Sequence, residues 1–119
     1  MINSLIRVVV SMLFIANSFA QEQDSLYNYV SEFKGDNIRT LISNLDESKY
    51  QVDSCKVHSF DYLYISTVSL YVGLHKIDID FKDKIKIKDK NHYNTLNSEC
   101  LTSKKLHKKI ISAIYVTTL

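Results

Sequence analysis

The stretch HKIDIDFKDKIKIKDK, residues 75–90, decides the fold, because its apolar and charged side chains alternate with a period of two. Such alternation is typical of antiparallel strands that turn one face to the core and the other to water. The Lys82-Asp83-Lys84 interruption fits either a hairpin turn or a charged kink in one long strand. The apolar side of the pattern consists of Ile77, Ile79, Phe81, Ile85 and Ile87.

Residues 60–75 carry the same period of two toward the N-terminus. Apolar side chains fill seven of the eight even positions and only three of the eight odd positions, and many are β-branched or aromatic, which favours a strand. A fully buried helix would give a similar pattern, so that alternative stays open. The even positions are Phe60, Tyr62, Tyr64, Ser66, Val68, Leu70, Val72 and Leu74.

Helical spacing precedes the strands. Two short amphipathic helices, or one kinked helix, are expected over about residues 24–47, with Asp24, Ser25 and Asp36 as N-cap candidates and Gly35 as the break. The stripes that would face the core are Leu26, Tyr29, Val30 and Phe33, then Ile38, Leu41, Ile42 and Leu45.

The C-terminal third is less regular. Residues 89–100 resemble a loop. Residues 101–119 follow a possible cap at Thr102 or Ser103 and place four apolar side chains at helical spacing: Leu106, Ile110, Ala113 and Ile114. The last residues, IISAIYVTTL, are β-branched enough to form a strand instead. We favour a C-terminal helix. The predicted class is α+β, with N-terminal helices, a central antiparallel meander of three or four strands and this helix; the alternative is an all-α, disulfide-linked bundle.

The N-terminal sequence MINSLIRVVVSMLFIANSFA has the layout of a secretory signal peptide. Arg7 precedes an apolar run, and the small residues Ser18 and Ala20 form a cleavage site. The run is shorter than the roughly 20 apolar residues that a membrane-spanning helix needs. We therefore expect cleavage after Ala20 and a single small exported domain over residues 21–119, periplasmic or secreted, with no membrane span after cleavage.

Two cysteines, Cys55 and Cys100, are the only ones in the chain. Exported proteins fold under oxidising conditions, so the simplest expectation is a Cys55–Cys100 disulfide. In the chain-entropy description it would contribute roughly 3 to 4 kcal/mol to a domain whose core alone is marginal. The rival interpretation is a catalytic Cys55 thiolate beside His58, which requires an unpaired thiol outside the cytoplasm.

The charges are sorted along the chain. Residues 21–81 carry five basic and ten acidic side chains, whereas residues 82–119 carry nine lysines and three acidic side chains. This asymmetry predicts either a partner with an acidic surface or mutual neutralisation, with lysines on the wet strand face opposite Asp78 and Asp80. The candidate interaction residues are Lys82, Lys84, Lys86, Lys88, Tyr93, Lys104, Lys105, Lys108 and Lys109.

Several functional classes have no support in the sequence. Gly35 and Gly73 stand alone, so no glycine-rich phosphate loop exists. Nucleic acid is not an expected partner, because residues 82–119 contain no arginine and the chain is exported. On a strand, Asp78 and Asp80 face away from His75, so no metal site is predicted. No cofactor and no enzymatic activity are expected.

Eight tyrosines are present, and tyrosine is enriched at protein interfaces. Tyr29, Tyr62 and Tyr64 are expected in the core or sheet. Tyr50, Tyr93 and Tyr115 lie at segment ends or off the apolar stripes, so these three are the better interface candidates.

The functional hypothesis is an exported, non-enzymatic module that binds another envelope or secreted protein as an inhibitor, immunity factor or accessory subunit. The alternatives are a binder of small apolar ligands or anionic lipid, and a periplasmic stress chaperone. In size, compartment and cysteine pair the chain resembles small acid-stress chaperones and the immunity proteins that neutralise cell-wall-degrading toxins. That resemblance identifies no site residues.

Overall fold

The structure, a computed structural model, describes residues 21–119, so the signal peptide predicted for residues 1–20 lies outside the described residues. The predicted α+β class is confirmed. One antiparallel sheet has the strand order β1-β2-β3-β4, which leaves β1 and β4 at its edges. The strands are β1 (Ser54–Phe60), β2 (Tyr64–Val72), β3 (His75–Lys86) and β4 (Ile111–Thr118).

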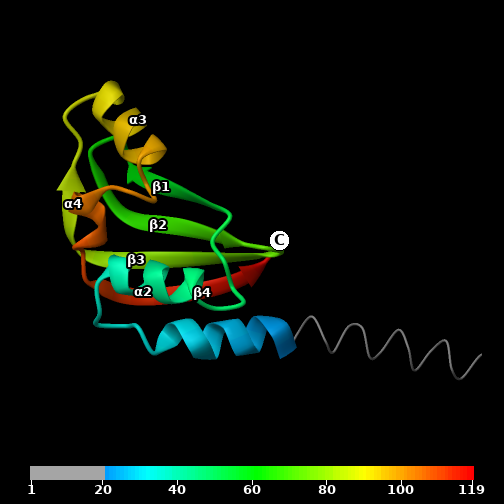
Figure 1. Ribbon diagram of the computed structural model, residues 1–119. Coiled ribbons are helices and arrows are strands. Elements are labelled where there is room, and N and C mark those ends of the chain that lie inside the picture. Colours follow the sequence, from blue (N-terminus) through cyan, green and yellow to red (C-terminus); the bar gives the residue numbers. More distant parts are fainter. Residues whose placement is uncertain (1–20) are drawn as a thin grey trace, which may run out of the picture.

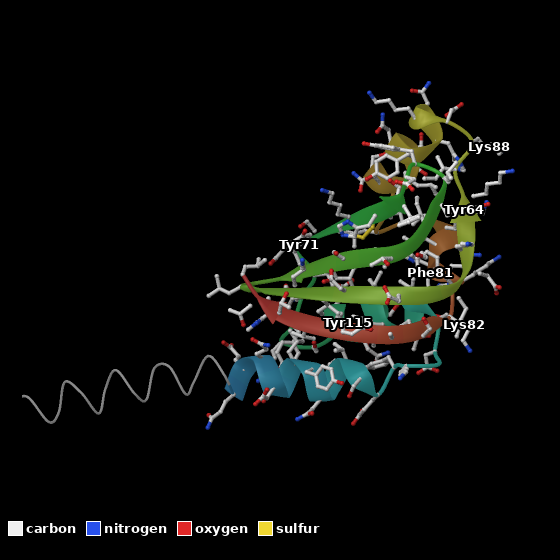
Figure 2. The ribbon with its side chains drawn as sticks, turned by 180° about the vertical axis from the view of Figure 1, so that it is seen from behind. Tyr64, Tyr71, Phe81, Lys82, Lys88 and Tyr115 are labelled. Carbon is white, nitrogen blue, oxygen red and sulfur yellow. A yellow bond between two sulfur atoms is a disulfide. The ribbon has the colours of Figure 1, made fainter. Side chains whose placement is uncertain are left out.

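The core lies on one face of this sheet, where α2 and α4 are packed in Figure 1. Ile79 of β3 stands opposite Val68 on β2 and Ile114 on β4, and all three side chains are buried. The opposite face of the sheet carries polar side chains and is seen in front of the helices in Figure 2. The alternation in residues 75–81 therefore arises as predicted: the odd-numbered side chains face the core, and the even-numbered ones face the open side of the sheet.

Two helices precede the sheet, as expected. Residues 21–31 are helical, and α2 (Ile38–Asp46) follows after a turn in which Gly35 has φ 93°. The cap of α2 is Asn37 and not Asp36, since the Asn37 side chain accepts the Thr40 N–H at 2.8 Å. The predicted stripes are buried at Leu26, Val30, Ile38, Leu41, Ile42 and Leu45, with Tyr29 and Phe33 packed partly against them.

The Lys82-Asp83-Lys84 interruption is a kink within one long strand. β3 continues through it to Lys86, and Asp83 adopts a left-handed conformation with φ 59°. The odd-numbered positions still face the core beyond the kink, where Ile85 and Ile87 are buried, whereas Asp83 at the kink is exposed.

The loop expected over residues 89–100 is wrong, because α3 (Lys90–Ser98) lies there. Asp89 caps this helix by accepting the His92 N–H at 2.7 Å. Only Leu96 of the helix is buried, so no apolar stripe marked it in the sequence.

The predicted C-terminal helix is also wrong beyond a single turn. α4 covers only Lys104–His107, and residues 111–118 form β4. Pairing with β3 decides between the two forms, because Val116 stands opposite Ile77 and Ile114 opposite Ile79. The strand alternative for IISAIYVTTL is the correct one.

The strand predicted across residues 60–75 is divided by a turn. Asp61 and Tyr62 form the tip of the β1–β2 hairpin, with φ of 50° and 55°. Phe60 and Tyr62 are consequently exposed instead of core-facing. A register shift between Ile65 and Thr67 then moves the core-facing parity, so Ile65 is buried whereas Tyr64 is half-buried.

The predicted disulfide is confirmed between Cys55 and Cys100, whose Cα atoms are 5.8 Å apart. It joins edge strand β1 to the residues just after α3. Because the Cys55 sulfur is bonded, it is not a free nucleophile for His58.

Candidate interaction surface

The first group of predicted lysines lies on the second half of β3 and just beyond it. Lys82, Lys84, Lys86 and Lys88 are all exposed, and Figure 2 shows Lys82 and Lys88 at the same end of the molecule. Their exposure follows from the alternation, since the odd-numbered residues between them, Ile85 and Ile87, are buried and hold the segment against the core. The predicted row of charge on one strand parity is present.

The second group, Lys104, Lys105, Lys108 and Lys109, lies on and after α4. Ser103 caps this helical turn, and the buried Leu106 side chain fixes its orientation so that the lysines point outward. Lys109 alone of the four is partly buried.

One backbone contact brings the two groups together. The Lys82 N–H donates to the carbonyl oxygen of Ile110, the residue after Lys109, at 2.9 Å. Figure 1 shows α4 beside the C-terminal end of β3, so eight lysines from the two segments lie at one end of the molecule, and we call them the basic surface. They are Lys82, Lys84, Lys86, Lys88, Lys104, Lys105, Lys108 and Lys109.

Within residues 21–119, no lysine of the basic surface forms an ion pair. Two pairs of basic and acidic side chains approach within 4.0 Å in this part of the chain: Lys76 forms an ion pair with Asp78 at 3.6 Å, and His75 Nε2 lies 4.0 Å from a Glu22 carboxylate oxygen. Both join residues of the acidic stretch, so the two stretches do not neutralise each other by direct contact. Asp78 and Asp80 lie opposite Tyr115 and Ala113 on β4, not opposite these lysines.

Tyr93 lies beside the basic surface but is not free for stacking. Its hydroxyl donates to the carbonyl oxygen of Val57 at 3.1 Å, and its ring meets Tyr62 edge-on with centroids 6.3 Å apart. Asn97 of the same helix accepts the Val57 N–H at 3.0 Å. Tyr93 and Asn97 thus form hydrogen bonds with the backbone of Val57 in edge strand β1, and these bonds hinder pairing of that edge with other chains.

The other tyrosines divide differently from the expectation. Tyr62 was expected in the core or sheet, but its side chain is 73% exposed at the hairpin tip. Tyr115, one of the three interface candidates, is 56% exposed. Tyr29 packs against the core and donates to the Asn44 carbonyl oxygen, and Tyr50 also packs partly against the core. The Lys84 ammonium lies 4.4 Å from the centre of the Tyr64 ring.

A hydrogen-bonded cluster on the open face of the sheet is absent from the sequence expectations. Ser69 Oγ–H donates to Asp78 Oδ1 at 2.5 Å, and His58 Nε2 lies 2.6 Å from Ser69 Oγ. Because the serine proton is directed at Asp78, His58 Nε2–H is the donor to Ser69. The three residues come from β1, β2 and β3 and meet only through strand register.

This cluster differs from a catalytic triad in both order and access. A triad places histidine between the nucleophile and the carboxylate, so that the imidazole removes the serine proton. Here Ser69 stands between His58 and Asp78, and its side chain is fully buried. The arrangement ties three strands together, and the Ser69 proton is directed at a carboxylate and not at an imidazole.

Burial lowers the pKa of His58 below its ordinary value of 6.5, against the opposing effect of Asp78, while Lys56 and Lys76 lower it further. The unfolded chain therefore binds a proton more readily than the folded one. We predict that the stabilisation from neutral His58 is complete above pH 6.5 and declines as pH falls below it. Urea midpoints measured across this range should decline less for His58→Gln than for the wild type. Equal slopes in the two proteins would contradict the prediction.

The structure adds two general findings on residues 21–119. No three His, Cys, Asp or Glu side chains in this range are grouped so that they could hold a metal ion. No helix in it is both long enough and apolar enough to cross a lipid bilayer. Comparison with known protein families, characterised proteins and solved structures found no match to this chain.

Proposed function

We propose that the protein is an exported, non-enzymatic binding module whose basic surface engages the acidic surface of another envelope or secreted protein. In this role it would act as an inhibitor, an immunity factor or an accessory subunit. The observation that carries the proposal is the gathering of eight lysines at one end of the molecule, none in an ion pair within the described residues. The disulfide is compatible with export.

The physical basis is electrostatic complementarity. Like charges held close together repel one another and oppose the compact state, and an acidic partner relieves that repulsion. Lysines at the rim of an interface also accelerate association by attracting the partner before contact. Salt screens exposed charges over about 8 to 10 Å near physiological ionic strength, so binding through this surface must weaken as salt is added.

The proposal is tested by capturing partners from an envelope extract with two charge-reversed proteins. Lys105→Glu with Lys108→Glu alters the basic surface, whereas Lys49→Glu with Lys56→Glu makes the same change of charge at exposed positions outside it. We predict that the first variant binds the captured partner about tenfold more weakly or worse, and that the second binds like the wild type.

Circular dichroism establishes that both variants are folded before binding is compared. A captured partner that the two variants bind equally well, or that high salt does not release, would contradict the proposal.

A further inference from the structure

We propose that the tip of the β1–β2 hairpin docks the protein onto the surface of an anionic lipid membrane. The tip consists of residues 60–63, Phe60-Asp61-Tyr62-Leu63. This inference goes beyond binding of a protein partner. It shares Lys82, Lys84, Lys86 and Lys88 with the basic surface, but it adds the apolar residues of the tip, which binding of an acidic protein does not use, so substitutions of the apolar residues test it separately.

Three large apolar side chains are exposed together at this turn. Phe60 is 74% exposed, Tyr62 is 73% exposed and Leu63 is 56% exposed. Single apolar side chains on a protein surface need no explanation, but a contiguous group indicates a contact with a partner or a membrane. Beside the tip, a cavity of about 410 Å³ extends the apolar surface, lined by Tyr62, Ile87, Asp89, Lys90 and Tyr93.

The backbone presents these side chains in a fixed way. Asp61 and Tyr62 both have positive φ, as in a type I′ turn, and the Leu63 N–H closes the turn on the Phe60 carbonyl oxygen at 3.0 Å. Left-handed backbone is unfavourable for a bulky residue such as Tyr62. The Ile87 N–H, which donates to the Leu63 carbonyl oxygen at 2.8 Å, joins the turn to the chain after β3. Docking would therefore order little additional backbone.

The charge around the tip complements an anionic surface. Residues 60–64 and 82–90 carry five lysines against three aspartates, and all five lysines are exposed. One of the aspartates, Asp89, is engaged by the His92 N–H at the start of α3. Lys86 stands opposite Tyr64 in the strand register, and the Lys84 ammonium lies over the Tyr64 ring. Figure 2 shows Tyr64 near the edge that bears Lys82 and Lys88.

The combination of lysines and exposed aromatic side chains favours lipid over protein as the binding partner of this tip. The buried centres of protein interfaces are enriched in arginine and depleted in lysine, and the residues around this apolar tip, 60–64 and 82–90, contain no arginine. Lysine side chains lie along apolar surface while their ammonium groups stay in water, and each gains free energy near anionic headgroups. Tyrosine is enriched at membrane interfaces for the same reason, since its ring is apolar and its hydroxyl is polar.

The experiment is co-flotation of the purified protein with lipid vesicles. Phosphatidylglycerol and phosphatidylcholine in equal parts supply the anionic surface, and phosphatidylcholine alone supplies the neutral one. We expect the wild type to float with the anionic vesicles and to bind the neutral ones much more weakly. Phe60→Ser with Leu63→Ser should reduce binding to anionic vesicles about tenfold or more, because apolar side-chain area is then lost from the contact. Wild-type protein that does not float with anionic vesicles would overturn the proposal.

The matched control lies at the other hairpin of the sheet. Leu74 at the β2–β3 turn is 58% exposed, close to the value for Leu63. The two residues lie at opposite ends of strand β2, so Leu74 is far from the tip. Leu74→Ser should leave vesicle binding unchanged, whereas Leu63→Ser should weaken it. Equal losses in the two variants would show that the apolar contact is unspecific and would overturn the proposal.

A second measurement does not depend on affinity. The chain has no tryptophan, so Tyr62→Trp introduces a single indole at the tip. Its emission should shift to shorter wavelength when anionic vesicles are added, while that of Tyr115→Trp on the open sheet face should not. An unshifted Tyr62→Trp spectrum on protein that floats with the vesicles would assign binding to another surface and overturn the proposal.

Discussion

Replacing both cysteines, by Cys55→Ala and Cys100→Ala, will lower the free energy of unfolding by roughly 3 to 4 kcal/mol. The cross-link joins residues 45 positions apart in the sequence, and its loss returns conformational freedom to the unfolded chain. In a domain of this size each kcal/mol corresponds to about 4 to 8 °C, so the melting temperature should fall by roughly 15 °C or more. Denaturant and thermal unfolding of the two proteins measure the effect.

Reduction of the wild type separates the cross-link from side-chain packing. Cys100 is buried, so its replacement by alanine also removes a packed sulfur atom, whereas dithiothreitol opens the bond and leaves both sulfur atoms in place. Reduced wild type and the double variant should therefore lose similar stability. If reduction leaves the unfolding midpoint unchanged, the covalent constraint is not the source of the stabilisation.

The local consequence of losing the disulfide falls on α3. This helix has one buried side chain, Leu96. It is otherwise held by the disulfide and by two hydrogen bonds with Val57, whose carbonyl oxygen accepts from Tyr93 and whose N–H donates to Asn97. Amide hydrogen exchange should therefore accelerate in α3 on reduction before it accelerates in β2 and β3. The position of edge strand β1 depends on the same contacts.

Segments with strong local patterns were predictable from the sequence. The alternation around Ile77 and Ile79 identified β3, because each odd side chain meets the core and each even one meets water. The apolar spacing of residues 24–47 identified the helices, and Gly35 marked the break between them. In these segments the local preference and the long-range packing agree.

Segments decided by distant partners were not predictable. The tail beginning at Ile111 is a strand because β3 offers it a pairing edge, which no local pattern reveals. The turn at Asp61 and Tyr62 contains no glycine, asparagine or proline, and Asp61 alone, among aromatic and aliphatic neighbours, was too weak a turn signal. α3 has too few buried residues to produce a stripe.

The candidate surface shows the same division. The row of Lys84, Lys86 and Lys88 follows from strand alternation, so it could be predicted. Its closeness to the lysines of α4 depends on the bond between Lys82 and Ile110, which joins segments far apart in the sequence. The His58, Ser69 and Asp78 cluster spans three strands, so only the register brings it together.

Ile79→Ala will lower the free energy of unfolding by about 2 to 5 kcal/mol, the range for removing a large aliphatic side chain from a packed core. Ile79 is fully buried at the centre of the sheet, with Val68 opposite on β2 and Ile114 opposite on β4, so its loss opens a cavity between three strands. Urea unfolding at constant pH measures the effect.

The control for Ile79→Ala is Lys86→Ala in the same strand. Lys86 is exposed, so its replacement should change stability by no more than about 0.5 kcal/mol. Both substitutions place alanine in β3, and strand preferences span only about 1 kcal/mol, so a larger difference between the two variants reports the packing of the Ile79 side chain. Equal losses in the two variants would mean that Ile79 does not lie in the core and that the sheet turns its other face toward the helices.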